Sequence, residues 1–238
     1  MEIKLHKKLI QHIKRFKYST TEIADALNKT GSIPLCYPIS QNTNFYKVGT
    51  VRLLFAANNS NWGVHNSIDT ILKGDIVVIF TENCSGKAII GDLISKYILE
   101  LKKAEAIVVH GLVRDSDSLI ESNYPIWSMG KTPIGCNNNE SIAFDNESRY
   151  FLEDKYSDGI AVCDTTGVVV IQNKYINDKI FQSLKFIRDQ EIVWLYCLTK
   201  LGWNTQKIVN EKAYLNENII APRKIQLAIN RLKKHVGN

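Results

Sequence analysis

The sequence predicts an α/β domain with helical segments at both ends, and three patterns support this class. The first is a continuous β-branched and aromatic run at Ile76–Phe80, typical of a strand buried on both faces. The second is a pair of further strand-like runs, Val48–Ala56 and Ala106–Val109, with helical patterns between the runs. The third is the helical periodicity of residues 2–16 and of the chain from Asp178 onward.

Length and composition fit one folded unit. The chain has 238 residues, which corresponds to one large domain or one domain with an appendage. Hydrophobic residues make up 45% of it, enough for a core, so extended disorder is not expected. No apolar run approaches the roughly 18 residues of a membrane span, and the charged N-terminus lacks the apolar segment of a secretory signal. No membrane partner is therefore expected.

The five cysteines lie far apart, and no pair has C-x-x-C spacing. This pattern argues against a zinc cage or a disulfide framework. Reduced thiols and a cytoplasmic location are the expectation. No sequence feature indicates activation of Cys84, Cys136 or Cys163 as a nucleophile. The chain also lacks a P-loop, a G-x-S-x-G motif and a strand-linked G-x-G-x-x-G, so nucleotide and triad chemistries receive no support.

The net charge of +6 is concentrated at the two ends of the chain. Residues 1–18 hold six basic residues and one acid, and residues 186–238 hold nine basic residues and four acids. The simplest interpretation is a solvated polar face on an amphipathic helix at each end. Contact with a polyanion is the alternative. Because the middle of the chain is mildly acidic, nucleic acid is not the expected partner.

Local signals place the remaining elements in order. Ser19–Glu22 (STTE) is a capping-box pattern that predicts a helix from Thr20 to about Asn28. A short helix is expected at 67–72, and a loop at 81–87 follows a strand where open α/β sheets carry ligand sites. Further expected elements are helices at 92–101, 116–123, 178–201, 204–212 and 222–235, strands at 106–110 and 124–127, a loop at 131–146, a hairpin of 159–163 and 168–172, and a C-cap at Gly202.

The best functional signal lies between Lys87 and Pro133. Asp92 stands at the start of a predicted helix, and Arg114 and Asp115 stand where the strand from Ala106 should end. If helix and strand are neighbours, two carboxylates and one guanidinium converge on one pocket. Two structural alternatives remain open. In the first, the role of Asp92 is purely structural, and its carboxylate stabilises the start of the helix. In the second, Arg114 and Asp115 form a surface ion pair.

Backbone groups can add to such a pocket. The amides of Leu93 and Ile94 lie in the first turn of the predicted helix, where they have no intrahelical partner and can bind an anion. A carboxylate with several waters suits Mg²⁺ or Mn²⁺, because Mg²⁺ loses its waters reluctantly. A permanently charged arginine can stabilise a developing enolate.

Several segments together resemble the RraA-like family, which contains the regulators of ribonuclease activity A and the 4-hydroxy-4-methyl-2-oxoglutarate aldolases. The resemblance covers about residues 19–175. The segments that carry it are Ser19–Leu27, Lys73–Val78, Gly91–Ile94, Gly111–Asp115, Tyr124–Trp127 and Gly159–Val170.

The resemblance implies a β/β/α core like the swivelling phosphohistidine domain. Outside it, the helical periodicity predicts N- and C-terminal helical extensions, which divides the chain into a basic helix at 1–18, the RraA-like domain at 19–177 and a helical extension at 178–238. It also implies a homotrimer, or a hexamer of paired trimers, with active sites at the subunit boundaries. The aldolases of the family take an acidic residue from the neighbouring subunit.

The resemblance also implies an activity. The aldolases of the family are divalent-metal lyases that release pyruvate, so Mg²⁺ or Mn²⁺ is the implied cofactor and a keto acid the implied substrate. By position, Asp115 would hold the metal and Arg114 the keto acid. The helix start from Gly91, with the amides of Leu93 and Ile94, would bind the pyruvyl carboxylate. Asp92 would orient a metal-bound water that relays protons.

Two departures from the family pattern bear on the site. Between Asp92 and Arg114 lie 21 residues, one more than in the aldolase motif, and the extra residue is expected in the helix or in the turn at 102–105. The strand after Gly74–Asp75 usually ends in an aspartate, but here it reads Phe80–Glu82 (FTE).

Three functions follow as hypotheses. The first is a metal-dependent lyase that cleaves a 4-hydroxy-2-keto dicarboxylic acid, with decarboxylation of an oxaloacetate-like acid as a second activity. The second is a non-catalytic regulator that binds a ribonuclease or another protein. The third is a scaffold whose basic ends contact RNA or an acidic partner.

Overall fold

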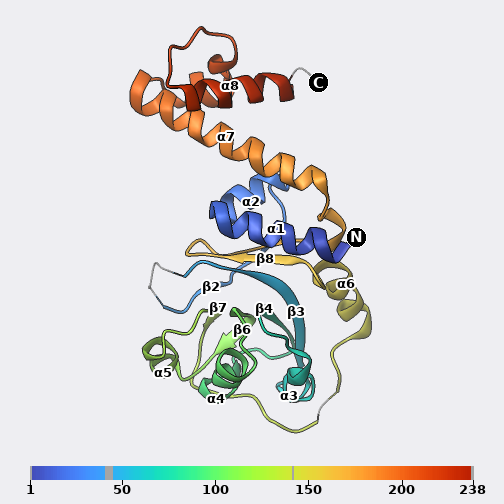
Figure 1. Ribbon diagram of the computed structural model, residues 1–238. Coiled ribbons are helices and arrows are strands. Elements are labelled where there is room, and N and C mark those ends of the chain that lie inside the picture. Colours follow the sequence, from blue (N-terminus) through green and yellow to red (C-terminus); the bar gives the residue numbers. More distant parts are fainter. Residues whose placement is uncertain (1, 41–44, 141, 237–238) are drawn as a thin grey trace.

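A single mixed sheet organises the chain in the computed structural model, which describes residues 2–40, 45–140 and 142–236 (Figure 1). Within the described residues the strand order is β1-β9-β8-β3-β4-β6-β7-β2, and β5 pairs with β6 beside this path. The strands are β1 (Ser32–Ile33), β2 (Tyr37–Pro38), β3 (Lys47–Ala57), β4 (Asp75–Glu82), β5 (Ala88–Ile90), β6 (Ala106–Val113), β7 (Ile126–Lys131), β8 (Ile160–Cys163) and β9 (Val168–Ile171).

The long strand β3 joins two halves of this sheet. Its first residues, Lys47–Thr50, pair antiparallel with β8, and Thr50–Ala57 pair parallel with β4. Strands β4, β6 and β7 continue in parallel, whereas β8, β9 and β1 form an antiparallel set. The carboxyl ends of β3, β4, β5 and β6 therefore lie at one edge, where parallel sheets place ligand sites.

Side chains alternate along each strand between two cores, as the two-residue period of a strand requires. In β4, Val77 and Ile79 face one hydrophobic cluster, and Ile76, Val78 and Phe80 face another. The second cluster also contains residues of β8 and β9, so it fills the space between the two halves of the sheet. This arrangement makes two β layers with helices outside each of them.

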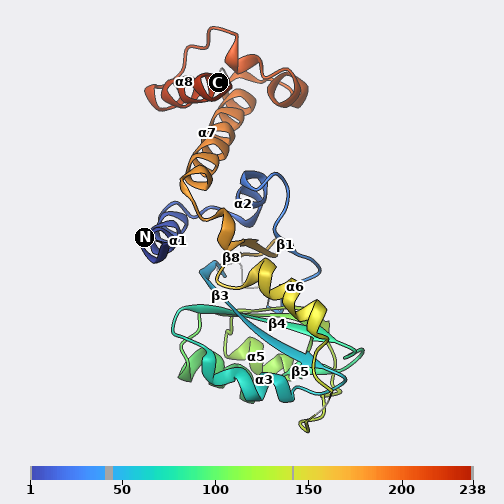
Figure 2. The same ribbon diagram turned by 90° about the vertical axis from the view of Figure 1, so that its right-hand side faces the viewer.

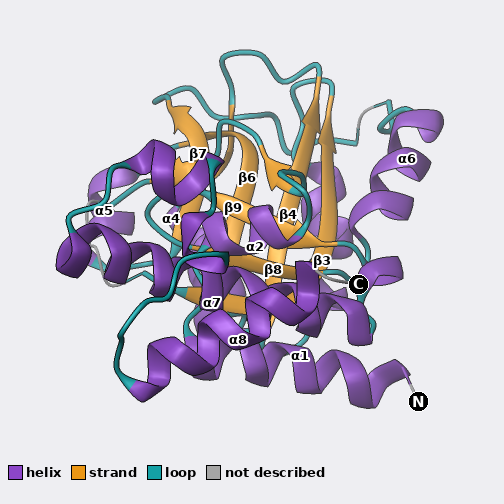
Figure 3. Cartoon of the chain, turned by 90° about the horizontal axis from the view of Figure 1, so that it is seen from above, coloured by secondary structure: helices purple, strands orange, loops and turns teal. Residues whose placement is uncertain are grey.

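Helices cover both outer faces. On one side α1 (Glu2–Phe16) and α2 (Thr20–Ala26) pack on β8 and β9, and the view from above shows α2 lying over these strands (Figure 3). The other outer face carries α3 (Trp62–Ser67), α4 (Asp92–Lys96) and α5 (Ser116–Glu121), while α6 (Asn146–Tyr156) packs along β3. The predicted mixed α/β class is confirmed. The swivelling-domain classification stays a prediction.

The local signals at the N-terminus and in the hairpin are confirmed. Helix α1 has the predicted bounds, and the capping box forms with the Ser19 amide donating to Glu22 Oε2 at 2.7 Å and the Glu22 amide donating to Ser19 Oγ at 3.1 Å. Strands β8 and β9 pair antiparallel as expected.

Other predictions were displaced or incomplete. The short helix expected at 67–72 lies earlier, at Trp62–Ser67, and only a 3₁₀ turn follows at Ile68–Thr70. Helix α6 had no predicted counterpart. A π turn, Gln206–Asn210, stands where a helix over 204–212 was expected.

The C-terminal helices project from the sheet (Figures 1 and 2). Helix α7 (Asp178–Leu201) has the predicted bounds and ends at Gly202, whose φ of 67° explains the choice of glycine. The start of α7 packs with α1 and α2, and its second half forms a separate core with α8 (Arg223–Val236). Among the described residues, no helix is long and apolar enough to cross a membrane. The boundaries 1–18, 19–177 and 178–238 stay predictions.

Candidate functional site

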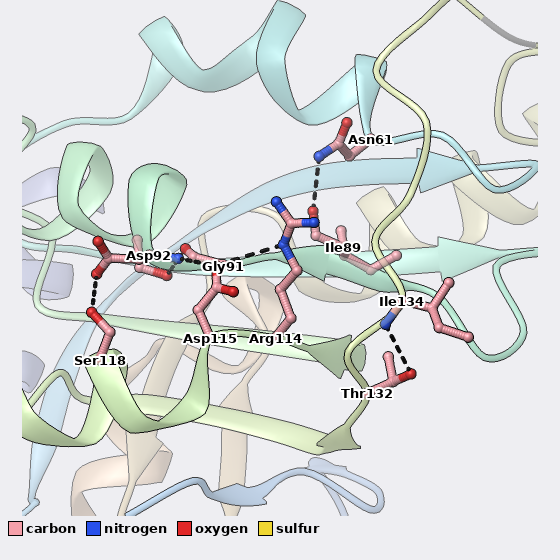
Figure 4. A network of polar contacts seen from close by, with 10 residues as sticks. Asn61, Ile89, Gly91, Asp92, Arg114, Asp115, Ser118, Thr132 and Ile134 are labelled. Atoms are coloured by element: carbon pink, nitrogen blue, oxygen red, sulfur yellow. Dashed lines mark hydrogen bonds and ion pairs between the residues drawn. The ribbon is translucent and has the colours of Figure 1, made fainter.

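A pocket of about 150 Å³ lies at the carboxyl ends of the parallel strands (Figure 4). Strand β5 leads into its wall at Gly91, and β6 leads into it at Arg114. The structure brings together in this wall all six site residues predicted from the sequence: Gly91, Asp92, Leu93, Ile94, Arg114 and Asp115. A larger and more open hollow of about 660 Å³ lies between α1 and α7, but none of the predicted site residues lines it.

The carboxylate of Asp115 is directed away from its own helix. Asp115 is the N-cap residue of α5, yet its side chain makes no cap hydrogen bond and its backbone is left-handed, with φ of 57°. Its Oδ2 accepts a hydrogen bond from the Asp92 amide at 3.1 Å and lies 3.6 Å from Nε of Arg114. A non-glycine residue in this conformation costs about 1–3 kcal/mol, and such residues cluster at functional sites.

Two glycines make room for the Arg114–Asp115 pair. A Cβ on Gly91 would overlap Oδ2 of Asp115, although the φ of Gly91 is ordinary for any residue. A Cβ on Gly135 would lie 2.5 Å from Nη1 of Arg114. A side chain at position 91 or 135 would therefore displace the Asp115 carboxylate or the Arg114 guanidinium from its present position. Gly135 did not stand out in the sequence, because the resemblance gave it no motif.

Asp92 is held by the neighbouring helix. Its Oδ1 accepts a hydrogen bond from Ser118 Oγ of α5 at 2.9 Å, and Figure 4 shows Ser118 reaching Asp92 from below. Because the Asp92 amide in turn donates to Asp115, α4 and α5 are joined by two reciprocal bonds. The orientation of both carboxylates is thus set by side chains and amides of the opposite element.

The helix after Asp92 contains a π turn at Tyr97–Leu101. The Lys102 amide donates to the Tyr97 carbonyl five residues earlier, at 3.0 Å, instead of four. A π turn holds one residue more than an α turn within an otherwise continuous helix. A π turn in this helix can hold the extra residue between Asp92 and Arg114, in one of the two expected places.

Asn61 is a pocket residue that the motifs did not indicate. It is only 6% exposed, and its Nδ2 donates to the carbonyl of Ile89 at 3.0 Å. Its Oδ1 is buried and has no donor among the residues that the structure describes. A buried acceptor without a partner costs about 1–3 kcal/mol, so a bound molecule or water with a free hydrogen would be favoured here. The sequence signal was the polar turn at 58–61, after a strand.

The donor set fits a hydrated hard cation. In the described part of the chain no three His, Cys, Asp or Glu side chains are grouped for metal binding. Asp115, 43% exposed, is the carboxylate turned into the site and can still share an oxygen with an ion. One carboxylate with a shell of waters is a pattern that Mg²⁺ accepts. Glu82, at the end of β4, is engaged elsewhere, because its Oε2 accepts from the Asp145 amide at 2.8 Å.

Comparisons with known proteins identify the family. The family model described as RraA-like (Aldolase/RraA) matches residues 20–170, more than half of the chain. The chain belongs to the RraA-like family. The resemblance seen in the sequence is thereby confirmed, and the pocket lies within the matched region. A search of curated proteins found no match.

Solved structures share the fold of this RraA-like chain. An uncharacterized protein from Pseudomonas syringae pv. tomato is 17% identical with a TM-score of 0.64, covering 84% of this chain and 96% of its own. RraAS2 of Streptomyces coelicolor, an unusual member of the RNase ES inhibitor RraA family, is 18% identical with a TM-score of 0.61, covering 78% and 96%. The RNA-processing inhibitor RraA from Thermus thermophilis is 18% identical with a TM-score of 0.50, covering 65% and 92%.

Proposed function

We propose that this RraA-like protein is a divalent-metal-dependent lyase that cleaves a 4-hydroxy-2-keto dicarboxylic acid and releases pyruvate. Decarboxylation of an oxaloacetate-like acid would be a second activity of the same site. The observation that carries the proposal is the convergence of Arg114, Asp115 and the Gly91–Ile94 helix start in one pocket. Each of these groups favours negative charge or holds a cation, which is what a keto acid that passes through an enolate needs.

Asp115 would hold the cofactor, Mg²⁺ or Mn²⁺. When bound, such an ion would act as a Lewis acid that stabilises negative charge on the keto oxygen of the substrate. The carboxylate is held for this role by the Asp92 amide and by the close approach of Gly91. The half-exposed position of Asp115 leaves room for the waters that Mg²⁺ retains.

The start of α4 would bind the pyruvyl carboxylate, and Arg114 would bind the keto acid and stabilise the developing enolate. The guanidinium offers a planar fork of donors that suits a carboxylate or an enolate oxygen. The amides of Leu93 and Ile94 belong to the first turn of α4, whose early amides have no carbonyl to bond within the helix. The substrate would thus lie between the ends of β5 and β6.

Asp92 would transfer protons in the site, and Asn61 would accept a hydrogen bond from a bound molecule. With its Oδ1 held by Ser118, the Asp92 carboxylate is fixed at the pocket wall and can accept or return a proton. The unpartnered Oδ1 of Asn61 would accept a hydrogen bond from a substrate hydroxyl or from an ordered water. Either donor would satisfy the buried acceptor.

The test is pyruvate release from a panel of 4-hydroxy-2-keto dicarboxylic acids and oxaloacetate, with Mg²⁺, with Mn²⁺ and with EDTA. Asp115→Asn is expected to lower kcat/KM by about 100- to 1000-fold, the scale for loss of one electrostatic stabiliser. Asp117→Asn, two residues on and exposed, is the matched control and should retain activity. Turnover that survives EDTA, or an Asp115→Asn variant of full activity, would refute the proposal.

The site also has features of a subunit boundary. Arg114 and Asp115 are 49% and 43% exposed in the single chain, which leaves one side of the pair open to a neighbour. A homotrimer, or a hexamer of trimers, in which the next subunit adds an acidic residue would close that side. Light scattering coupled to gel filtration measures this directly, and a monomeric peak with full activity would contradict it.

A non-catalytic regulator is the second candidate, and the C-terminal extension favours it. A largely apolar groove of about 320 Å³ lies between α7 and the π turn at Gln206–Asn210. It includes the exposed side chains of Leu195, Leu198 and Val209. Exposed apolar surface of this kind is typical of protein contacts. A ribonuclease or another protein would be the partner. Failure of every keto acid to turn over in the folded, metal-loaded protein would favour this function.

A further inference from the structure

Two cysteines far apart in the chain meet beside the candidate site. Cys84 follows β4 and Cys136 follows β7, 52 positions later, and Asn59 joins their neighbours: its amide donates to the Asn83 carbonyl at 3.0 Å, and its carbonyl accepts from the Asn137 amide. Both side chains pack in the hydrophobic cluster that lies beneath the site. Cys136 also lines the pocket wall with Arg114. No C-x-x-C spacing or other sequence motif predicts this pair.

The backbone fixes the two thiols in place. The Cys136 amide donates to the Ala88 carbonyl at 3.0 Å, and the next amide, of Asn137, donates to the Asn59 carbonyl at 2.8 Å. On the other side, the Lys87 amide donates to the Cys84 carbonyl at 3.1 Å and closes a tight turn. Since both segments are anchored, contact between the sulfurs does not depend on a mobile loop.

The surroundings distinguish the two thiols chemically. The interaction with the Cys136 thiol lowers the pKa of Cys84 to about 7. Burial acts in the opposite direction, and the backbone amides of Asn59 and Ser60 lower the pKa further. The same contact and burial raise the pKa of Cys136. A thiolate is the nucleophile in cysteine chemistry, so Cys84 would attack first and Cys136 would resolve. No motif around Cys84 or Cys136 in the sequence indicates this difference between the two thiols.

We propose that hydrogen peroxide oxidises the thiols of Cys84 and Cys136 to a disulfide beside the pocket. The Cys84 thiolate attacks one oxygen of hydrogen peroxide, the O–O bond breaks, and water leaves after protonation, so that Cys84 becomes a sulfenic acid. Cys136 sulfur then attacks the Cys84 sulfur and displaces a second water. Two thiols and one peroxide thus give one disulfide and two waters, and an added dithiol reduces the disulfide back to two thiols while it is itself oxidised to a disulfide.

The site gives the pair both access and a consequence. Cys136 is partly exposed along the pocket wall, which offers a small oxidant a route to the sulfurs. The preceding residue, Gly135, lies against the guanidinium of Arg114. The disulfide would tie this segment to the loop after β4 and fix the surface on which Arg114 rests. The thiol chemistry itself does not depend on whether the pocket cleaves a keto acid.

The experiment titrates the reduced full-length protein with hydrogen peroxide and counts free thiols after denaturation. The five thiols of the reduced chain should fall to three, with loss of two hydrogen atoms in the intact mass and recovery on addition of dithiothreitol. Peptide mapping of the unmutated protein should place the bond between Cys84 and Cys136. A map that shows another pair, or only sulfinic and sulfonic products at Cys84, would overturn the proposal.

Variants separate the pair from the other thiols. Cys84→Ser should keep its four thiols at the peroxide dose that leaves three in the unmutated chain, whereas Cys136→Ser should lose the Cys84 thiol to sulfenic acid and form no disulfide. Cys163→Ala is the control, because Cys163 and its neighbour Cys36 are also buried together, but burial raises the pKa of both thiols. This control should still form the disulfide. If it loses the response as well, or if Cys84→Ser keeps it, the assignment to this pair is wrong.

Discussion

The Oδ2 oxygen of Asp115 occupies the space that a side chain at Gly91 would fill. The glycine is therefore needed for close approach and not for its backbone angle, which any residue could adopt. The contact joins the end of β5 to the start of α5, and the neighbouring Asp92 amide donates to the same oxygen at 3.1 Å. The position of the proposed metal ligand depends directly on a residue from another strand.

Gly91→Ala should disable the site without unfolding the chain. The added methyl group would displace the Asp115 carboxylate and the Arg114 side chain from their present positions. The Cγ of Arg114 would lie 3.0 Å from the new atom. Since a small misplacement in a site can cost about 100-fold in rate, kcat/KM for pyruvate release should fall by at least that factor. Mn²⁺ affinity, measured by electron paramagnetic resonance, should fall with it.

Gly130→Ala is the control for this substitution. Its Cβ would meet Cδ2 of Leu112 at 3.2 Å, and a flexible side-chain end can yield by a few tenths of an ångström. The control should therefore keep its activity and its Mn²⁺ affinity. If Gly91→Ala binds Mn²⁺ as tightly as the unmutated protein, Asp115 does not hold the ion.

Arg114→Lys should separate substrate binding from metal binding. Lysine keeps the positive charge but lacks the planar fork, so one charge-assisted hydrogen bond to the keto acid would be lost. A loss of about 1.5–3 kcal/mol corresponds to a rise in KM of roughly 10- to 100-fold, while Mn²⁺ affinity stays near its original value. Arg149→Lys, which changes an exposed ion pair on α6, should alter neither quantity. An unchanged KM in Arg114→Lys would remove Arg114 from the substrate contacts.

Elements with strong local signals were predictable from the sequence. The capping box at Ser19 set the start of α2, and the apolar periodicity from Asp178 with a glycine at 202 set both ends of α7. The site residues could be named because each stands directly at the end of a strand or the start of a helix. A buried run of strand residues fixes such a position, even when the rest of the fold is unknown.

Features that depend on distant contacts were not predictable. Helix α6 has mostly exposed side chains and little apolar periodicity, so only its N-cap, Asp145, signalled it. The left-handed backbone of Asp115 and the open acceptor of Asn61 are consequences of packing, not of local propensity. Cys84 and Cys136 meet only because β4 and the segment after β7 lie together in the folded chain.

The contact between α2 and α7 should make stability depend on pH. Burial, followed by the charges of Glu22 and Asp25, raises the pKa of Glu191 to about 7. Its unfolded value is about 4.3, so the folded chain holds a proton that the unfolded chain releases. The resulting stabilisation is present below about pH 4 and is lost as the pH rises through 7.

Glu191→Gln should remove that dependence. At pH 8 the variant avoids the buried charge and should gain about 1 kcal/mol, a value discounted for partial exposure, or roughly 2–4 °C in melting temperature. Glu211→Gln, at an exposed position, should leave the curve unchanged. Melting curves between pH 5 and 9 test both, and a Glu191→Gln curve parallel to that of the unmutated protein would contradict the assignment.

The π turn at Tyr97–Leu101 should tolerate the loss of one residue. Deletion of Leu101, which is mostly exposed, would let the turn close with ordinary α-helical bonds and leave Asp92 and Arg114 in place. Deletion of Ser95 is the comparison, because this buried residue bonds the Gly91 carbonyl at 2.8 Å and its loss would rotate the helix start. The first variant should retain pyruvate release within about tenfold, and the second should lose it by 100-fold or more. Equal losses in both variants, with folding intact by circular dichroism, would show that the π turn itself positions Asp92.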